Sequence, residues 1–160
     1  MLQIECISIF DMLKIGVGPS SSHTLGPWRA AEKWIKELKT LGVFEQVKEV
    51  NVHIYGSLAL TGKGHATDYA IILGLSGADP EYVPIEHIHS LVLSVKEGQV
   101  LMLGAEKNIP FDPKTNIIFQ RKFLPFHANG IKFEAILNTG QKKSKTYYSI
   151  GGGFVVTEER

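Results

Sequence analysis

The sequence predicts an α+β fold in which a mixed, largely antiparallel sheet packs against helices. Apolar residues recur at every third or fourth position in some segments and at every second position in others, as in amphipathic helices and half-buried strands. Segments of both kinds are interspersed along 160 residues, of which 44% are hydrophobic, and this suits one domain with one core. We therefore expect residues 1–160 to form a single layered domain.

Four helices are expected from the three-to-four spacing. A short helix is predicted over residues 7–14. The second covers residues 24–38, with a Ser or Thr just before the apolar pattern as N-cap and Pro27 in the first turn, where proline is tolerated. A mostly buried helix over residues 66–75 ends near glycines, and a last helix runs over residues 86–97.

The strands are expected from period-two alternation. Residues 47–55 alternate as a half-buried strand does. Further strands are predicted at residues 116–120, 131–138 and 145–150, and a polar turn at 140–142 joins the last two. Strands mixed with helices favour a layered sheet over a helical bundle.

Composition excludes several functions. A net charge of +1 gives no basis for binding nucleic acid or an acidic membrane surface. No apolar run approaches the ~20 residues that span a bilayer, and the first residues lack the basic start of a signal peptide, so we expect a cytoplasmic protein. Cys6 is the only cysteine, which excludes an internal disulfide and an iron-sulfur cluster held by this chain alone.

The most informative segment is KIGVGPSSSHT at residues 14–24, which places hydroxyls and an imidazole on a turn shaped by glycine and proline. Its hydroxyls belong to Ser20, Ser21, Ser22 and Thr24, and its imidazole to His23. Glycine permits close approach of the backbone to a ligand, and Pro19 fixes one φ angle. The free N–H groups of the helix start that follows suit a carboxylate or phosphate. The competing interpretation is that these residues only cap the helix.

Three further motifs accompany this segment along the chain. They are YGSLALTGKGHATD at residues 55–68, HANG at 127–130 and SKTYYSIGGGF at 144–154. With these four motifs in this order, the chain from Ser8 to Glu159 resembles the β domain, or β subunit, of the bacterial iron-sulfur L-serine dehydratases, also called L-serine ammonia-lyases. That family accepts other residues at the positions of Ala66 and Ala128. The resemblance implies a cytoplasmic lyase of serine catabolism and gluconeogenesis that converts L-serine to pyruvate and ammonia.

The resemblance also implies a cofactor and partners. In that family a [4Fe-4S] cluster with one open iron, held by a cysteine-bearing α domain, acts as Lewis acid on the departing hydroxyl. The active site lies at the junction of the α and β domains. L-serine, the cluster-bearing α domain or subunit and a second copy in a homodimer are thus the expected partners, and no metal ligand is expected in this chain.

Five residues are expected to be catalytic under this resemblance: His23, His65, Thr67, His127 and Asn129. The three histidines lie in loops with neighbouring glycines, and these loops match the segments that face the junction. Because histidine titrates near pH ~6.5, His65 or His23 could accept the α-proton, and their spacing does not decide between them. The substrate carboxylate is expected to bind hydroxyl and N–H groups of Ser20, Ser21, Ser22, Thr24 and Thr67.

Other motifs are interpreted as structural. Residues 56–64 differ from a phosphate-binding P-loop, because five residues separate the glycines and a glycine replaces the magnesium-binding Ser or Thr. The glycines at 151–153 have no helix after them and indicate a tight turn or close backbone contact. His53 is expected to be solvent-exposed or at a sheet edge, and His87 and His89 to lie on a helix surface.

The same motifs are also compatible with a second, non-catalytic function. A similar domain is the effector-binding domain of some phosphoglycerate dehydrogenases, where it senses serine-like ligands, so a non-catalytic binding module is the alternative. The loop histidines with Thr67 and Asn129 favour catalysis. We also expect the three histidine loops to converge on one cleft and the apolar run at 154–156 to contact a partner. The chain end at residues 157–160 is expected to mark a domain boundary or a split subunit.

Overall fold

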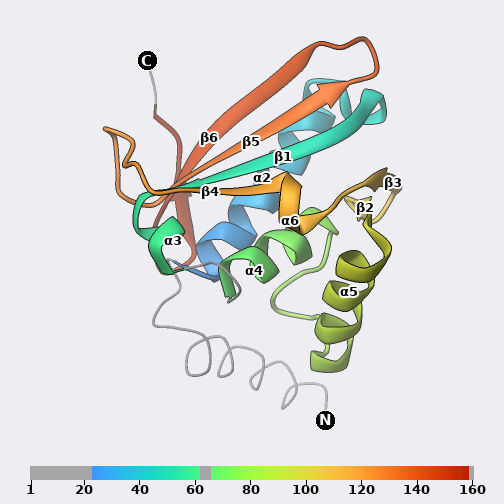
Figure 1. Ribbon diagram of the computed structural model, residues 1–160, viewed down its shortest axis with the longest axis horizontal. Helices are drawn as coiled ribbons and strands as arrows, with labels where there is room; N and C mark the ends of the chain where they lie inside the picture. The colour runs from blue at the N-terminus through green and yellow to red at the C-terminus, as the bar shows by residue number, and fades with distance from the viewer. Residues whose placement is uncertain (1–22, 62–65, 159–160) are drawn as a thin grey trace.

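The computed structural model describes residues 23–61 and 66–158, in which helices pack on one face of a five-stranded sheet (Figure 1). The helices are α2 (Leu25–Thr40), α3 (Gly56–Thr61), α4 (Ala66–Leu75), α5 (Ile85–Gly98) and the short α6 (Pro113–Asn116). The strands of the sheet are β1 (Val47–Tyr55), β4 (Ile117–Gln120), β5 (Gly130–Leu137), β6 (Lys142–Gly151) and β7 (Phe154–Val156). A 3₁₀ turn, Phe44–Gln46, precedes β1, and β2 (Val100–Leu103) and β3 (Lys107–Pro110) form a separate hairpin. The helix predicted over residues 7–14 lies outside the described residues.

The sheet is mixed and largely antiparallel, which confirms the predicted fold class. Its strand order is β4-β1-β5-β6-β7, with β1 parallel to β4 and every other neighbouring pair antiparallel. In this register Val52 of β1 lies opposite both Ile117 and Phe133, and all three side chains are buried. The alternation seen in the sequence therefore builds one continuous apolar face across the sheet.

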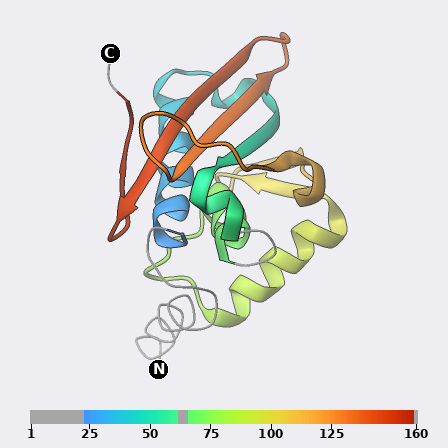
Figure 2. The same ribbon diagram turned by 60° about the vertical axis from the view of Figure 1, so that its left-hand side comes forward.

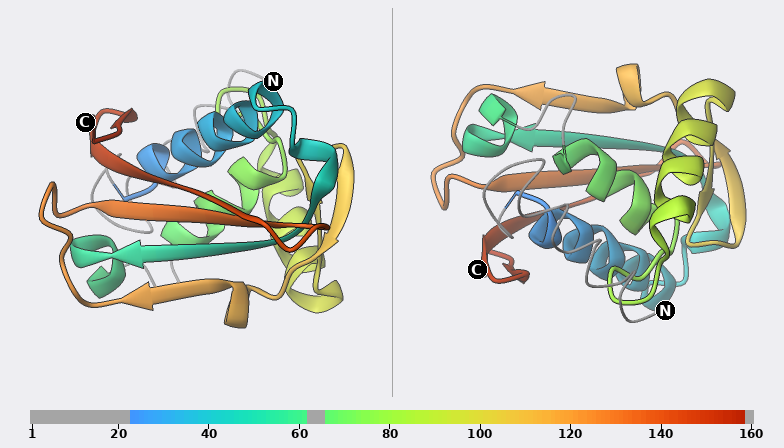
Figure 3. Two further views of the ribbon diagram at one scale, coloured as in Figure 1. Left: turned by 90° about the horizontal axis from the view of Figure 1, so that it is seen from above. Right: turned by 90° about the horizontal axis from the view of Figure 1, so that it is seen from below.

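The core fills the space between that face and helices α2 and α4. Trp34 of α2 stacks on Phe133 of β5 with 5.1 Å between ring centroids, and Tyr147 of β6 meets Phe133 edge-on at 5.8 Å. Trp28 is fully buried, and its indole N–H donates to the Ala78 carbonyl at 2.8 Å. Views from above and below show helices on one side of the sheet only (Figure 3). The opposite face of the sheet has no helix over it within the described ranges.

Three local features differ from the sequence-based expectation. Thr24 holds the N-cap position of α2, but its side chain makes no capping hydrogen bond. Helix α3 and the β2–β3 hairpin were not predicted, because four-residue strands and a six-residue helix are too short to show a clear period. The strand expected at 145–150 begins three residues earlier, at Lys142.

Within the described ranges, no helix combines the length and the apolar composition needed to cross a membrane.

Candidate functional site

One end of the sheet gathers the starts of three helices. The Thr67 hydroxyl, at the start of α4, donates to the His23 carbonyl, just before α2, at 2.6 Å. The His23 ring in turn hydrogen-bonds the backbone of Ser57, in the first turn of α3. Segments of the first two motifs are thus in direct contact, as expected from the predicted convergence of the loops.

The loop between β4 and β5 joins the same end and crosses the sheet beside α3 (Figure 2). The Gly56 N–H donates to the Lys122 carbonyl at 2.9 Å, and the Ser57 N–H donates to the Ala128 carbonyl at 3.1 Å. The Ser57 hydroxyl also donates to Oδ1 of Asn129. Two motifs that lie 71 residues apart in the chain are therefore joined by both backbone and side-chain hydrogen bonds.

Asn129 also fastens this loop to the sheet. Its side-chain N–H₂ group donates to the Ser149 carbonyl at 3.1 Å, and its own carbonyl accepts the Ser149 N–H at 3.0 Å. The Asn129 side chain therefore uses its oxygen toward α3 and its nitrogen toward β6. This arrangement explains why an amide, which both donates and accepts, fits this position.

Glycine is required where β1 turns into α3. Gly56 has φ of +63°, and a Cβ at this position would lie 2.2 Å from the Ala128 carbonyl oxygen. The β6–β7 turn makes a similar close approach, because a Cβ on Gly153 would lie 2.9 Å from Leu25 of α2. The glycines at 151–153 thus form the tight turn that the sequence predicted, and residues 56–61 form the short helix α3.

His127 has a defined proton arrangement. Its Nδ1 accepts the backbone N–H of Asn129 at 3.0 Å, so in the neutral ring Nδ1 is unprotonated and Nε2 carries the hydrogen. The ring also lies edge-on to Tyr148, with centroids 6.3 Å apart. Neutral His127 therefore offers a hydrogen-bond donor at Nε2, whereas taking up a proton at Nδ1 would break its bond to Asn129.

His23 has a different electrostatic setting. Burial lowers its pKa below the ordinary value of 6.5, and the hydrogen bond with the Ser57 backbone opposes part of that effect. A hydrogen bond that raises a histidine pKa favours the charged ring, so the Ser57 carbonyl is the acceptor and a ring N–H the donor. His23 is therefore neutral at pH 7, with one ring nitrogen of acceptor character.

Of the predicted site residues that the structure describes, all lie in this region. They are His23, Thr24, Thr67, His127 and Asn129. Thr24 and Thr67 are buried, at 3% and 1% exposure, and the Thr67 hydroxyl holds the starts of α2 and α4 together. Ser20, Ser21, Ser22 and His65 lie outside the described residues. Ser57 was not predicted, although it stands in the 55–68 motif directly after the strand, because its role depends on backbone contacts that spacing does not reveal.

Three histidines lie outside this region. His87 and His89 are exposed on α5, as predicted. His53 was expected to be solvent-exposed or at a sheet edge, but β1 lies inside the sheet and the side chain is half-buried. Its Nδ1 lies 2.8 Å from Nε2 of Gln120. Burial lowers the pKa of His53 as well.

His23 and His53 make the stability of the domain depend on pH. Because the pKa of each histidine is lower in the folded state, the folded protein binds fewer protons than the unfolded protein does at the same pH. The free energy of unfolding therefore rises with pH, until the pH passes the unfolded-state pKa near 6.5. We expect stability to decrease as the pH falls from about 7 to about 5. Urea unfolding at several pH values should show a smaller slope for His23→Gln and a smaller one still for His23→Gln with His53→Gln. An unchanged slope in the double variant would contradict this assignment.

The described residues do not fit an iron-sulfur cluster. No group of three or more His, Cys, Asp or Glu side chains in the ranges 23–61 and 66–158 is arranged to hold a metal ion. The whole sequence has one cysteine, Cys6, whereas such clusters are typically held by four thiolates.

The fold and the site define an α+β domain that gathers hydroxyl, amide and imidazole groups from separate motifs at one end of its sheet. The serine dehydratase beta chain family model matches residues 8–160, and the chain belongs to this family. It is 47% identical over 154 residues to an L-serine dehydratase of Haemophilus influenzae, covering 95% of this chain and 34% of that protein. It is 46% identical to L-serine dehydratase 1 of Escherichia coli, over 96% of this chain and 34% of that one. An L-serine dehydratase of Streptomyces coelicolor is 43% identical over 96% of this chain and 34% of its own length. The chain thus spans about a third of the length of the curated relatives it matches.

Proposed function

We propose that this chain is the β part of an L-serine ammonia-lyase and supplies substrate-binding and acid–base residues to a site completed by a second domain. The observation that carries the proposal is the network in which Ser57 links His23 to Asn129, and Asn129 orients His127. The relatives named L-serine dehydratase are about three times as long as the matched region, which leaves room for that domain. We place the reaction in the cytoplasm.

The reaction needs one proton acceptor and several donors. Removal of the proton on Cα and loss of the β-hydroxyl as water convert L-serine to aminoacrylate. Aminoacrylate tautomerises to an imine, and water then hydrolyses the imine to pyruvate and ammonia. The substrate carboxylate must stay bound by N–H and O–H donors throughout, which is the role proposed for the serine-rich segment and the start of α2.

The two described histidines suit different roles in this chemistry. His127 presents Nε2–H, so we assign it as a hydrogen-bond donor to a substrate oxygen. Neutral His23 has an acceptor nitrogen. Either His23 or His65 is the proposed acceptor of the proton on Cα. Because Cys6 is the only cysteine, we place the ligands of a [4Fe-4S] cluster in the second domain and not in this chain.

The proposal predicts that the 160-residue chain alone forms no pyruvate from L-serine. Activity should appear when the cysteine-bearing remainder of a relative, reconstituted with iron and sulfide under anaerobic conditions, is joined to or mixed with it. Pyruvate is measured with lactate dehydrogenase and NADH, and the remainder without this chain is the control. Turnover by the chain alone would contradict the proposal, as would an inactive pair that nevertheless binds L-serine and carries an intact cluster.

The homodimer expected from the resemblance stays a prediction. Phe154 is 70% exposed on β7, which is an edge strand of the sheet. Val155 and Val156 beside it are half-buried. An exposed aromatic ring on an edge strand suits contact with a partner.

A further inference from the structure

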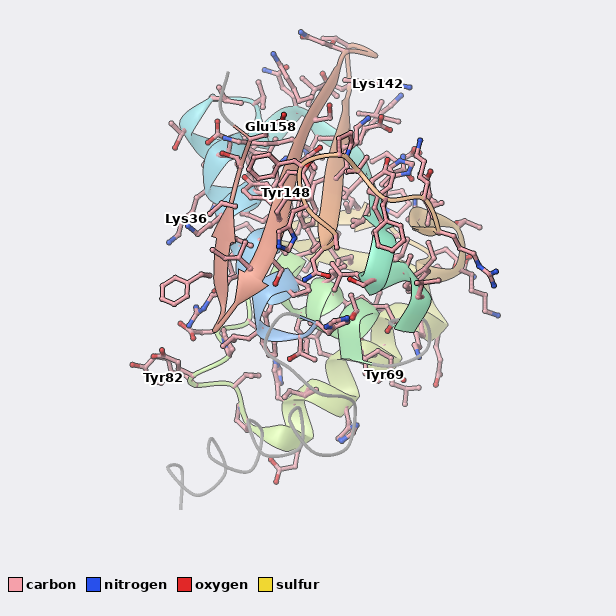
Figure 4. All side chains as sticks on the ribbon, turned by 90° about the vertical axis from the view of Figure 1, so that its left-hand side faces the viewer. Lys36, Tyr69, Tyr82, Lys142, Tyr148 and Glu158 are labelled. Carbon is pink, nitrogen blue, oxygen red and sulfur yellow. The ribbon has the colours of Figure 1, made fainter. Side chains whose placement is uncertain are left out.

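A groove lies between helix α2 and the β6–β7 edge of the sheet, and the network at His23 and Asn129 does not use it. Its volume is about 610 Å³. It is lined by Lys33, Lys36, Glu37, Thr40, Lys145, Tyr147, Val155, Val156 and Thr157. Lys33, Lys36, Glu37 and Thr40 are three and four positions apart and therefore share one face of α2. Figure 4 shows the labelled Lys36 projecting from α2 beside β7.

The groove has an excess of positive charge. Three ammonium groups line it, those of Lys33, Lys36 and Lys145, against the single carboxylate of Glu37. Lys145 Nζ lies 3.5 Å from Glu37 Oε2, so this pair is largely neutralised. Lys33 and Lys36 make no ion pair with another described residue closer than 4.0 Å. Two positive charges therefore remain on one helix face.

Tyr147 adds a neutral donor to the groove. The residue is only 4% exposed, and its ring is fixed against Phe133 and under Lys145, whose Nζ is 5.9 Å from the ring centroid. No described residue hydrogen-bonds its hydroxyl, although the side chain lines the groove. Burial, and then the carboxylate of Glu37, raise the pKa of Tyr147 far above its usual range, so the hydroxyl keeps its proton and can donate.

We propose that this groove binds a small dianion such as a phosphate group. Lys33 and Lys36 would neutralise its two charges, and the Tyr147 hydroxyl would donate to one of its oxygens. Val155 and Val156 form an apolar wall that suits the organic part of a phosphate monoester. This inference does not depend on the proposed lyase function, because it uses none of the residues assigned to that site.

The test is titration calorimetry of the full chain with inorganic phosphate, sulfate and acetate at equal ionic strength. We expect saturable binding of phosphate and sulfate and none of acetate, because two positive charges favour a dianion. Lys33→Met and Lys36→Met should each raise the Kd for phosphate about tenfold, the effect of losing one charged hydrogen bond. Tyr147→Phe keeps the ring contact with Phe133 and should raise the Kd several-fold. The matched control is Lys142→Met, on the same strand as Tyr147 but at its far end (Figure 4), which should leave the Kd unchanged.

Three results would overturn the proposal. The first is the absence of saturable phosphate binding by the folded chain. The second is a Kd for phosphate that is the same in the Lys33, Lys36 and Tyr147 variants as in the parent, with thermal unfolding showing that each variant is folded. The third is acetate binding as strong as phosphate binding, which would show that the groove does not select a dianion.

Discussion

Replacing Gly56 by alanine is expected to destabilise the domain by about 2–5 kcal/mol. Alanine costs about 1–2 kcal/mol in the left-handed region where Gly56 sits, at φ of +63°. Its Cβ would also lie 2.2 Å from the Ala128 carbonyl oxygen, and relief of such overlap costs typically about 1–3 kcal/mol. The atom it strikes belongs to the backbone, so the loop at Ala128 must move. Urea unfolding followed by circular dichroism measures the change in the free energy of unfolding.

Gly42→Ala is the matched control. Gly42 has a similar φ of +74°, but nothing lies within 4 Å of the Cβ position there. That variant should therefore lose only about 1–2 kcal/mol, the backbone cost alone. Equal losses in the two variants would show that contact with Ala128 is unimportant and that only the backbone conformation counts.

Replacing His65 by alanine in the assembled enzyme is expected to lower turnover about 100-fold or more. The expectation follows from the proposed role of His65 or His23 as the group that accepts the Cα proton, for which no other residue has been proposed. Steady-state pyruvate formation measures kcat, and cluster content measured by absorbance shows that the partner domain is intact. His23→Ala in parallel compares the two candidate acceptors, since the base is the one whose loss removes the rise of kcat with pH that a catalytic histidine produces.

His87→Ala is the control for this experiment, because His87 is an exposed histidine on α5 outside the site. It should leave kcat unchanged. Normal turnover by both His65→Ala and His23→Ala would remove histidine base catalysis from the mechanism and favour a binding role for this domain.

Much of the fold could be predicted because its main elements are long and periodic. The nine-residue β1 and the 16-residue α2 repeat their burial pattern enough times for the period to be clear. Helix α4 was located by a continuous apolar run, and it is buried along most of its length. The β2–β3 hairpin was missed because its four-residue strands are too short to show a clear period.

The sequence predicted which residues belong to the candidate site, but not the hydrogen bonds that connect them. His23, Thr67, His127 and Asn129 were found because polar residues beside glycines mark loops that approach ligands. The interactions of Ser57 could not be predicted, because two of them use its backbone N–H and carbonyl groups, which do not depend on residue type. The role of Thr67 in catalysis and substrate binding stays a prediction, and the bond that its hydroxyl donates to the His23 carbonyl was not foreseen, because it depends on how α2 and α4 pack.

The distances along the chain between the contacts of this site bear on how quickly it forms. Thr67 and His23 are 44 residues apart, and Ser57 and Asn129 are 72 apart. The parallel pair β1–β4 and the antiparallel pair β1–β5 also join distant segments. Domains that mix helices with such non-local strand pairs fold more slowly than helical bundles, because loop-closure entropy is lost before the contacts form. The site therefore depends on the same long-range closures as the sheet, and it forms only after segments from both halves of the chain have met.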